Sequence, residues 1–304
     1  MKNILVIGGS GFLGGAIIGE LARRGGFTQT CITVPTRRPE RARHLLVMPT
    51  VKLVGADVHD PAVLGRLMQG QDAVISLVGI LRSAEGQPYG KDFAHAHVDL
   101  PQKIAVAALR AGVRRVIHVS ALQASADAPS GYLRSKAAGE AALRAADLDL
   151  TIFRPSVIFG QGDSFLTLFA GLAKIAPFFP LASPDARFAP VWIGDVANCV
   201  VDSLLNSASI GQCYNLCGPQ QYSLRELVRY AAAVAGHPRT VIGLPDAIAW
   251  LQAWLMEFLP DPPMTRDNLR SMRVDSVCAE GTMLPFGRKA ASLEAIAPTY
   301  LTAP

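Results

Sequence analysis

The sequence predicts an α/β fold, with a doubly wound parallel sheet followed by a smaller C-terminal region. Short apolar runs recur through the first half of the chain, helix-length segments separate them, and the first run opens directly into glycines. Strands that alternate with helices form right-handed βαβ units, in which the strands lie parallel. We place the first domain at residues 1–156. Residues 157–304 form a mixed region for a substrate or partner, from which some elements return to the sheet.

Each strand is expected as a short aliphatic run buried on both faces of the sheet. The expected strands cover residues 4–7, 31–34, 51–54, 73–78, 116–119 and 150–153, and the expected helices cover residues 12–21, 100–111 and 135–146. The alternation then stops, because residues 160–190 are rich in Pro, Phe and Leu without a clean period. A helix is expected from about residue 193, a strand at 213–216, and a helix at 223–235, where Ser223 and Glu226 have capping-box spacing.

Residues 247–259 are apolar almost all round, but the segment is too short to cross a bilayer. We expect a buried helix there, with a helix that faces a partner or a membrane surface as the alternative. No apolar run in the chain reaches the 18 or more residues of a membrane span, so no transmembrane segment is predicted.

The composition is that of a folded protein with a sizeable core. Of the 304 residues, 50% are hydrophobic and 17% are charged, with a net charge of +5, which argues against disorder. No zinc spacing and no basic stripe with interleaved aromatics is present, so neither a metal site nor a nucleic-acid partner is predicted. The N-terminus lacks a signal-peptide pattern. The five irregularly spaced cysteines are expected as buried thiols in a reducing cytoplasm.

A glycine-rich turn follows the first expected strand and precedes the first expected helix. It reads Gly8-Gly9-Ser10-Gly11-Phe12-Leu13-Gly14, in which Gly9, Gly11 and Gly14 have the G-x-G-x-x-G spacing. Glycines are needed because the turn is tight and a pyrophosphate must reach bare backbone amides, while the helix N-terminus supplies partial positive charge. Between a strand and a helix, this motif predicts a Rossmann-type dinucleotide-binding domain.

The residues after the second expected strand bear on the choice of cofactor. An NAD-selective site places an acid there for the ribose 2′-hydroxyl. This chain has Arg37 and Arg38 instead, and no acid before Glu40. Guanidinium groups suit a 2′-phosphate, so we predict NADP(H), with NAD(H) as the less favoured alternative. The wider cluster, which adds Arg41 and Arg43, has a solvated surface as its other interpretation.

Two further strand ends are expected to complete the cofactor site. Asp57 and Val58 follow the third strand, where the Asp57 carboxylate either accepts a hydrogen bond from the adenine amino group or caps the helix that begins at Pro61. Val78 and Gly79 close the fourth strand, and small residues at this point let the adenosine ribose lie against the backbone.

Tyr132 and Lys136 form a Y-x-x-x-K pair shortly after the fifth strand. Residues four apart on a helix share one face. An ammonium beside a phenol favours the phenolate, so we expect Lys136 to lower the pKa of Tyr132, which would act as a general acid or base. Lys136 is also expected to hold the nicotinamide ribose.

Together with further stretches, these features resemble the short-chain dehydrogenase/reductase superfamily, and best its extended or atypical branch of NAD-dependent epimerases and dehydratases. The stretches are HVSA at 118–121, FRPSVIFG at 153–160, PVWIGDVA at 190–197 and YNLCGP at 214–219. YLRSKAAGE at 132–140 and MTRDNL at 264–269 resemble bacterial relatives of the NADPH-binding accessory subunit of respiratory complex I. The resemblance implies that Ser120, Tyr132 and Lys136 are catalytic. It also implies that these residues and Pro155-Ser156-Val157 contact the cofactor.

Two positions depart from the superfamily pattern. Active members carry a Ser or Thr just beyond the fifth strand, whereas residues 121–123 are Ala-Leu-Gln here. Ser125 or Ser130 would have to substitute. His97 stands where the superfamily often has an Asn, and a core or hydrogen-bonded histidine is favoured over a proton relay.

Two functional hypotheses follow from the resemblance. The first is an NADP(H)-dependent oxidoreductase or epimerase with a small-molecule substrate. Nucleotide sugars are the superfamily default, but the mostly apolar residues 160–190 offer a diphosphate only Lys174 and Arg187, the latter the candidate substrate residue, so an apolar substrate fits better. The alternative is a non-catalytic accessory or assembly factor of a complex I-type membrane assembly, with NADPH as a structural ligand. Such a protein would be cytoplasmic and peripheral to the inner membrane, and a homodimer is the other arrangement considered.

Overall fold

The computed structural model describes residues 1–260 and 262–302. Its main sheet has seven parallel strands in the order β11-β6-β5-β4-β1-β2-β3. The strands are β1 (Asn3–Ile7), β2 (Cys31–Thr36), β3 (Val51–Gly55), β4 (Ala73–Ser76), β5 (Arg115–Val119), β6 (Asp149–Pro155) and β11 (Cys213–Leu216). The order reverses between β1 and β4, which creates a crevice at their carboxyl ends where such folds bind ligands. The predicted doubly wound α/β fold is confirmed.

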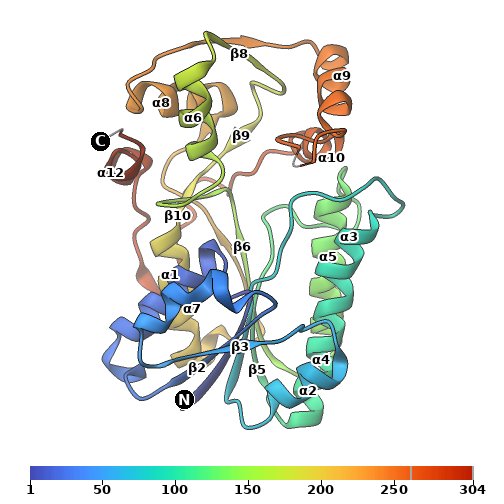
Figure 1. Ribbon diagram of the computed structural model, residues 1–304, viewed down its shortest axis with the longest axis vertical. Helices are drawn as coiled ribbons and strands as arrows, with labels where there is room; N and C mark the ends of the chain where they lie inside the picture. The colour runs from blue at the N-terminus through green and yellow to red at the C-terminus, as the bar shows by residue number, and fades with distance from the viewer. Residues whose placement is uncertain (261, 303–304) are drawn as a thin grey trace.

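Helices cover both faces of this sheet (Figure 1), so its central strands are buried on both sides, whereas the edge strands β3 and β11 are partly exposed. One face carries α1 (Phe12–Arg23) and α7 (Ile193–Leu205), which pack against each other. The other face carries α2 (Pro61–Met68), α4 (Leu100–Ala111) and α5 (Gly131–Arg144), which pack in a row. Helix α5 starts four residues earlier than expected because the Ser130 hydroxyl caps its first turn by accepting from the Leu133 amide.

Several short turns connect these elements. They are η1 (Gly25–Phe27), η2 (Pro39–Val47), α3 (Lys91–Phe93), η3 (Ala94–Asp99), η4 (Ser207–Ser209) and η5 (Pro285–Gly287). The η3 segment is a π-helix that runs directly into α4. Such wide turns inside helices are frequent at functional sites.

The C-terminal region builds three two-stranded sheets above the carboxyl edge of the main sheet (Figure 1). They pair β7 (Ile158–Phe159) with β10 (Val191–Trp192), β9 (Arg187–Phe188) with β12 (Tyr222–Ser223), and β8 (Phe178–Leu181) with β13 (Thr240–Gly243). Its helices are α6 (Leu166–Ile175), α8 (Leu224–Val234), α9 (Asp246–Met256), α10 (Arg266–Ser271), α11 (Leu293–Ile296) and α12 (Pro298–Leu301). The predicted capping box of Ser223 and Glu226 opens α8.

Two expectations about this region are wrong. Helix α9 is not buried, because only Ala249 and Ala253 are fully buried and Trp250 partly so, while most of its other large apolar side chains are exposed. The cysteines are not all buried thiols either. Cys217 and Cys278 form a disulfide, and Cys213 is exposed. In the described part of the chain, no helix is both long and apolar enough to cross a membrane.

Candidate functional site

The glycine-rich turn joins β1 to α1 in a conformation that only glycine tolerates at two points. Gly8 has φ +85°, and the Gly11 amide donates to its carbonyl at 3.1 Å. A Cβ at Gly14 would lie 2.5 Å from the Gly8 carbonyl oxygen and from Gly9 Cα, so α1 can approach the turn only without a side chain there. No side chain caps α1 at Gly11, and its first turn has no acid. The N-terminal end of α1 therefore keeps the partial positive charge that favours an anion.

A pocket of about 440 Å³ opens beside this turn. Its walls come from the ends of β1, β2, β3 and β4, so seven predicted cofactor residues line one cavity: Gly8, Ser10, Arg37, Arg38, Asp57, Val58 and Val78. The remaining wall residues are Pro35, Thr36, Arg41, Ala42, Ala56 and His59. Gly9, Gly11, Phe12, Leu13 and Gly14 belong to the same turn and helix start but do not line this cavity.

Three arginines on the pocket wall are free to bind an anion. Arg37 and Arg38 follow β2, and the η2 turn brings Arg41 back to the same wall. All three side chains are exposed, and none forms an ion pair with any residue that the structure describes. Sequence reasoning grouped Arg41 with Arg43 without separating them, and only Arg41 lines the pocket.

The two aspartates after β3, Asp57 and Asp60, have different roles. Asp60 caps α2 by accepting from the Ala62 and Val63 amides. Asp57 instead accepts from the His59 amide at 3.0 Å, so the alternative in which Asp57 caps the helix is wrong. The His59 ring stacks on His95 of η3, with centroids 3.6 Å apart, a pair that sequence reasoning missed because the two residues are far apart in the chain.

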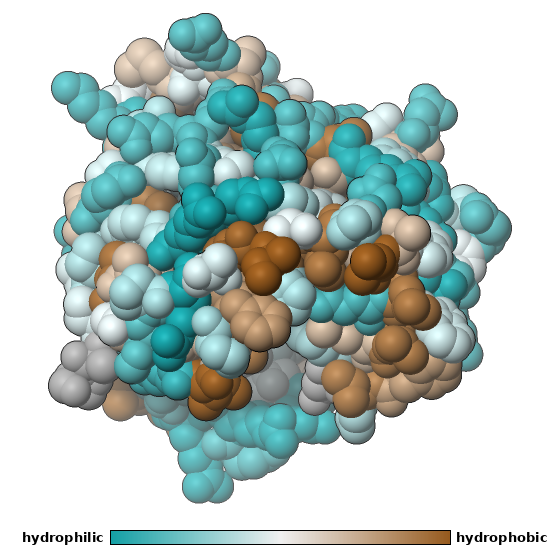
Figure 2. Space-filling model, turned by 90° about the horizontal axis from the view of Figure 1, so that it is seen from above, coloured by the Kyte–Doolittle hydropathy of each residue, from teal (hydrophilic) through white to brown (hydrophobic). Residues whose placement is uncertain are grey.

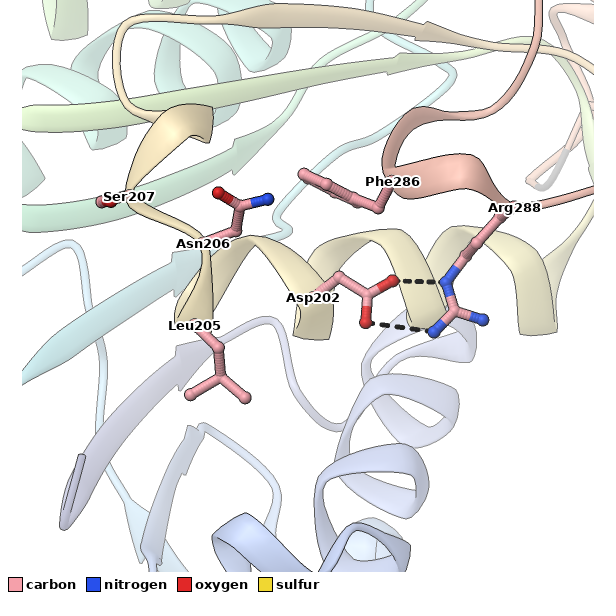
Figure 3. Close-up of a pocket in the computed structure, with 6 residues that line it drawn as sticks. All are labelled: Asp202, Leu205, Asn206, Ser207, Phe286 and Arg288. Carbon is pink, nitrogen blue, oxygen red and sulfur yellow. Dashed lines mark hydrogen bonds and ion pairs between the residues drawn. The ribbon is translucent and has the colours of Figure 1, made fainter.

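A second pocket, of about 640 Å³, lies at the far end of α7 and is lined by Asp202, Leu205, Asn206, Ser207, Phe286 and Arg288 (Figure 3). Its charges are already paired, because Arg288 bonds Asp202 through both Nε and Nη2, and Arg24 reaches the same carboxylate at 2.6 Å. Since α7 ends where the chain returns to the start of β11, this pocket lies away from the carboxyl edge of the sheet. We assign it no role.

Lys136 is buried at the carboxyl edge of the sheet, 4% exposed. Its ammonium Nζ donates to the Val119 carbonyl at 2.9 Å, and burial lowers the pKa of Lys136 to about 8. Burial raises the pKa of Tyr132 to about 12. The expectation that Lys136 lowers the pKa of Tyr132 is therefore wrong. Loss of hydration on burial is the cause of the raised pKa, so Tyr132 is a neutral phenol at neutral pH.

His97 is a fully hydrogen-bonded core residue, as favoured from the sequence. The Ile80 amide donates to Nε2 at 3.0 Å, so Nδ1 carries the proton and donates to the Ser135 hydroxyl at 2.8 Å. Burial lowers the pKa of His97 to about 3, which keeps the ring neutral. Gly79 lies between His97 and Lys136, because a Cβ at Gly79 would be 3.9 Å from Nε2 and 4.0 Å from Nζ.

The N-terminus of α5 is held by a residue that sequence reasoning did not single out. Asp267, at the start of α10, accepts from the Gly131 amide at 2.7 Å and the Tyr132 amide at 2.9 Å. The contact fixes the first turn of the helix that carries Tyr132 and Lys136. It joins positions 135 residues apart, so no local pattern points to it.

Of the three serines considered near the end of β5, one hydroxyl has no hydrogen-bond partner in the described residues and two have one. Ser120 is 6% exposed and its buried hydroxyl has no partner in the described residues. Ser130 caps α5, and Ser125 is exposed and accepts from the Asp127 amide. Neither offers a replacement for the missing serine beyond β5. Leu122 occupies that stretch and is buried against Ala189 and Cys217.

The remaining predicted residues lie apart from the nucleotide pocket. Pro155 accepts at its carbonyl from the Leu122 amide, and the Ser156 hydroxyl donates to the Ser276 carbonyl at 2.6 Å, so both tie the end of β6 to neighbouring loops. Val157 follows them and is partly buried. Arg187 is exposed on β9 and lines neither pocket.

Comparisons with known proteins agree with this architecture. A family model described as NAD(P)H-binding matches residues 8–164. NADH dehydrogenase (ubiquinone) 1 alpha subcomplex subunit 9 of Rattus norvegicus mitochondria is 31% identical over 282 residues, 90% of this chain and 72% of that protein. The ceramide reductase of Caulobacter vibrioides is 31% identical over 260 residues, 83% of this chain and 78% of that protein.

Among solved structures, UDP-glucuronic acid 4-epimerase of Bacillus cereus in complex with UDP-glucuronic acid and NAD superposes with a TM-score of 0.68. It is 17% identical, and the match covers 91% of this chain and 95% of that one, a likeness of fold. From the family match and the two relatives, the chain belongs to the NAD(P)H-binding family, and its fold is that of extended short-chain dehydrogenase/reductase-type proteins.

Proposed function

We propose that this chain is an NADP(H)-dependent reductase in which Tyr132 protonates the oxygen of a carbonyl substrate. The preference for NADP(H) over NAD(H) rests on the pocket wall. It holds three arginines without ion-pair partners among the described residues, and no carboxylate follows β2 there. A 2′-phosphate would satisfy these guanidinium groups through charge-assisted hydrogen bonds, whereas a 2′-hydroxyl would leave them facing one another.

The rest of the site fits the cofactor as well. The crowded Gly8–Gly14 turn leaves bare amides at the N-terminus of α1 for a pyrophosphate. The Asp57 carboxylate uses Oδ1 on the His59 amide, which leaves Oδ2 for the adenine amino group. The Ser120 hydroxyl, which has no partner among the described residues, and the Lys136 ammonium would bind the nicotinamide half of the cofactor.

When bound, NADPH supplies a hydride to the carbonyl carbon. Tyr132 donates its proton to the carbonyl oxygen, and its raised pKa suits donation because the phenol stays protonated at neutral pH. Lys136, protonated below its pKa of about 8, stabilises the tyrosinate that remains until solvent returns the proton. His97 holds the Ile80 amide and, through Ser135, the Tyr132 carbonyl, so it positions both sides of the reacting centre.

An apolar carbonyl compound is the favoured substrate. The relative named ceramide reductase supports this class. The site offers few cations for a diphosphate beyond the nucleotide pocket, since Arg187 is exposed on β9 and Lys174 lies at the end of α6.

The test is NADPH oxidation with long-chain ketones, aldehydes and nucleotide sugars as substrates. Tyr132→Phe is expected to lower kcat by about 100-fold or more, as for loss of a general acid, while the NADPH dissociation constant stays unchanged. Tyr230→Phe, on α8, is the matched control and should turn over normally. Unchanged turnover in Tyr132→Phe would refute the role given to this phenol.

A second candidate is a non-catalytic NADPH-binding accessory factor of a complex I-type assembly. Leu122 favours it, because an apolar side chain fills the stretch where active members orient the substrate oxygen, and the relative from Rattus norvegicus carries a complex I subunit name. Tight NADPH binding without oxidation by any substrate, with Tyr132→Phe indistinguishable from wild type, is the outcome this candidate predicts.

A further inference from the structure

Helix α9 packs with two alanines and Trp250 inward and most of its other large side chains outward. Ala249 and Ala253 face the core and are 3% and 0% exposed. On the opposite side of α9 and in the two residues after Glu257, six large side chains are 41–72% exposed: Ile248, Leu251, Trp254, Leu255, Phe258 and Leu259. The alanines and Trp250 make the core contact, so packing within this chain does not explain the outer residues.

The neighbouring sheet of β8 and β13 continues this pattern. Phe179 and Val241 point inward, whereas Phe178 and Ile242 point outward and are 50% and 48% exposed. Ile175, at the end of α6, is also exposed. Figure 2, seen from above, shows hydrophobic side chains gathered across this end of the molecule. We define the apolar face as these outward residues: Ile175, Phe178, Ile242, Ile248, Leu251, Trp254, Leu255, Phe258 and Leu259.

The chemistry of the apolar face fits a lipid surface better than a protein. Specific protein interfaces carry about one hydrogen bond per 100–200 Å², and these nine side chains offer one polar group, the Trp254 indole N–H. Aromatic and aliphatic groups on a short surface helix are instead what a bilayer interface accepts. With so few directional groups, this face can be buried in lipid without leaving donors or acceptors unsatisfied.

The charges at its edge favour an anionic bilayer. Lys174 and Arg239 adjoin Ile175 and Thr240, and neither has an ion-pair partner in the described residues. Arg239 is held in place, because its Nε donates to the Ala173 carbonyl at 2.9 Å. The exposed acid of this surface, Asp246, lies in the first turn of α9, where the helix dipole offsets its charge. Glu257 is neutralised by Arg266 at 2.8 Å.

We propose that the apolar face docks on the surface of an anionic lipid bilayer, with α9 lying in the interface. The docked helix is linked to the site, because α10 packs against α9 and its Asp267 holds the first turn of α5. Docking therefore brings the mouth of the site to the membrane, from which an apolar substrate would enter. This proposal rests on the surface alone and stands whether or not the chain is a reductase.

The test is flotation of the full chain with vesicles of phosphatidylcholine alone or with about 30% phosphatidylglycerol. An anionic bilayer attracts each basic residue near its surface by about 1 kcal/mol, which is equivalent to about fivefold in binding. Wild type is expected to float with the anionic vesicles and less with neutral ones. The double variant Leu251→Gln/Leu255→Gln should lose binding about tenfold or more, and Lys174→Glu, which changes the charge by two units, should lose it about 25-fold with anionic vesicles only.

Leu205→Gln is the matched control, because Leu205 is equally exposed but lies at the far end of α7, and it should float like wild type. NADPH binding by all variants should be unchanged, which separates this test from that of the reductase. Failure of wild type to float with either vesicle would overturn the proposal. So would a dimer in light scattering that Leu251→Gln/Leu255→Gln converts to a monomer, because a second copy would then cover the face.

Discussion

At the scale of single residues, burial sets the protonation of the two groups proposed for catalysis. Lys136 and Tyr132 lie on one helix, yet the ammonium bonds a main-chain carbonyl and the phenol is surrounded by Phe93, His97 and apolar side chains. Each group is driven towards its neutral form. A bound dinucleotide, with its negative phosphates and ribose hydroxyls, would restore charge to Lys136 and supply the polar partners that this end of the site lacks.

Lys136 makes the stability of the fold depend on pH in a defined direction. Its pKa is lowered from 10.5 to about 8, so between these values the unfolded chain holds a proton that the folded chain has lost. The cost of burying the charge is therefore fully present below pH 8 and disappears as the pH rises towards 10.5. Relative to Lys136→Met, wild type should gain on the order of 3 kcal/mol between pH 7 and pH 10.

Urea unfolding of both proteins at the two pH values measures this gain. The quantity to compare is the difference in free energy of unfolding between wild type and Lys136→Met at each pH. Other titrating groups contribute equally to both chains and cancel in this difference. A difference that stays constant with pH would show that Lys136 is not desolvated in the fold.

Sequence reasoning reached the residues whose role follows from position on a strand end. The turn at Gly8–Gly14, the arginines after β2 and Asp57 after β3 all lie where a parallel sheet presents its carboxyl edge, and the pocket unites them. It did not separate Arg41 from Arg43, because their placement depends on the winding of η2, and it missed the His59–His95 stack. It also predicted the wrong direction for the pKa shift of Tyr132, because spacing along a helix does not reveal burial.

At the scale of elements, the π-helix η3 and the short helix α10 act as braces around α5. His97 of η3 bonds Ser135, and Asp267 of α10 bonds the amides of Gly131 and Tyr132. Both contacts are long-range, so amphipathic patterns do not foresee them. The orientation of α9 was equally unpredictable, because a helix that is apolar almost all round gives no signal for which side faces the core.

The brace from α10 gives a prediction for stability. Asp267 is 8% exposed and accepts two amides at a helix N-terminus, so Asp267→Asn should lower the free energy of unfolding by about 1–2 kcal/mol. Asp127→Asn, at an exposed position whose side chain bonds no residue that the structure describes, is the control and should change stability little. Equal stability of the two variants in urea unfolding would contradict the bracing role.

At the scale of the whole molecule, the parallel sheet sets where every proposed function is located. Its strand order reverses between β1 and β4, and both the nucleotide pocket and Lys136 lie at the carboxyl edge near this reversal. The alternation of apolar runs with helices was enough to predict this architecture. The packing of the C-terminal region was not predictable, because its two-stranded sheets join short segments with no period of their own.

The central claim is that this pocket selects NADP(H) through its free arginines, and calorimetric titration of the purified chain with NADPH and NADH tests it most directly. We expect NADPH to bind at least about tenfold more tightly, the effect of one or more charge-assisted hydrogen bonds to the 2′-phosphate. Arg38→Ala should remove most of that preference without weakening NADH, whereas Arg43→Ala, outside the pocket, should keep it. Equal or tighter binding of NADH by the wild-type chain would contradict the account.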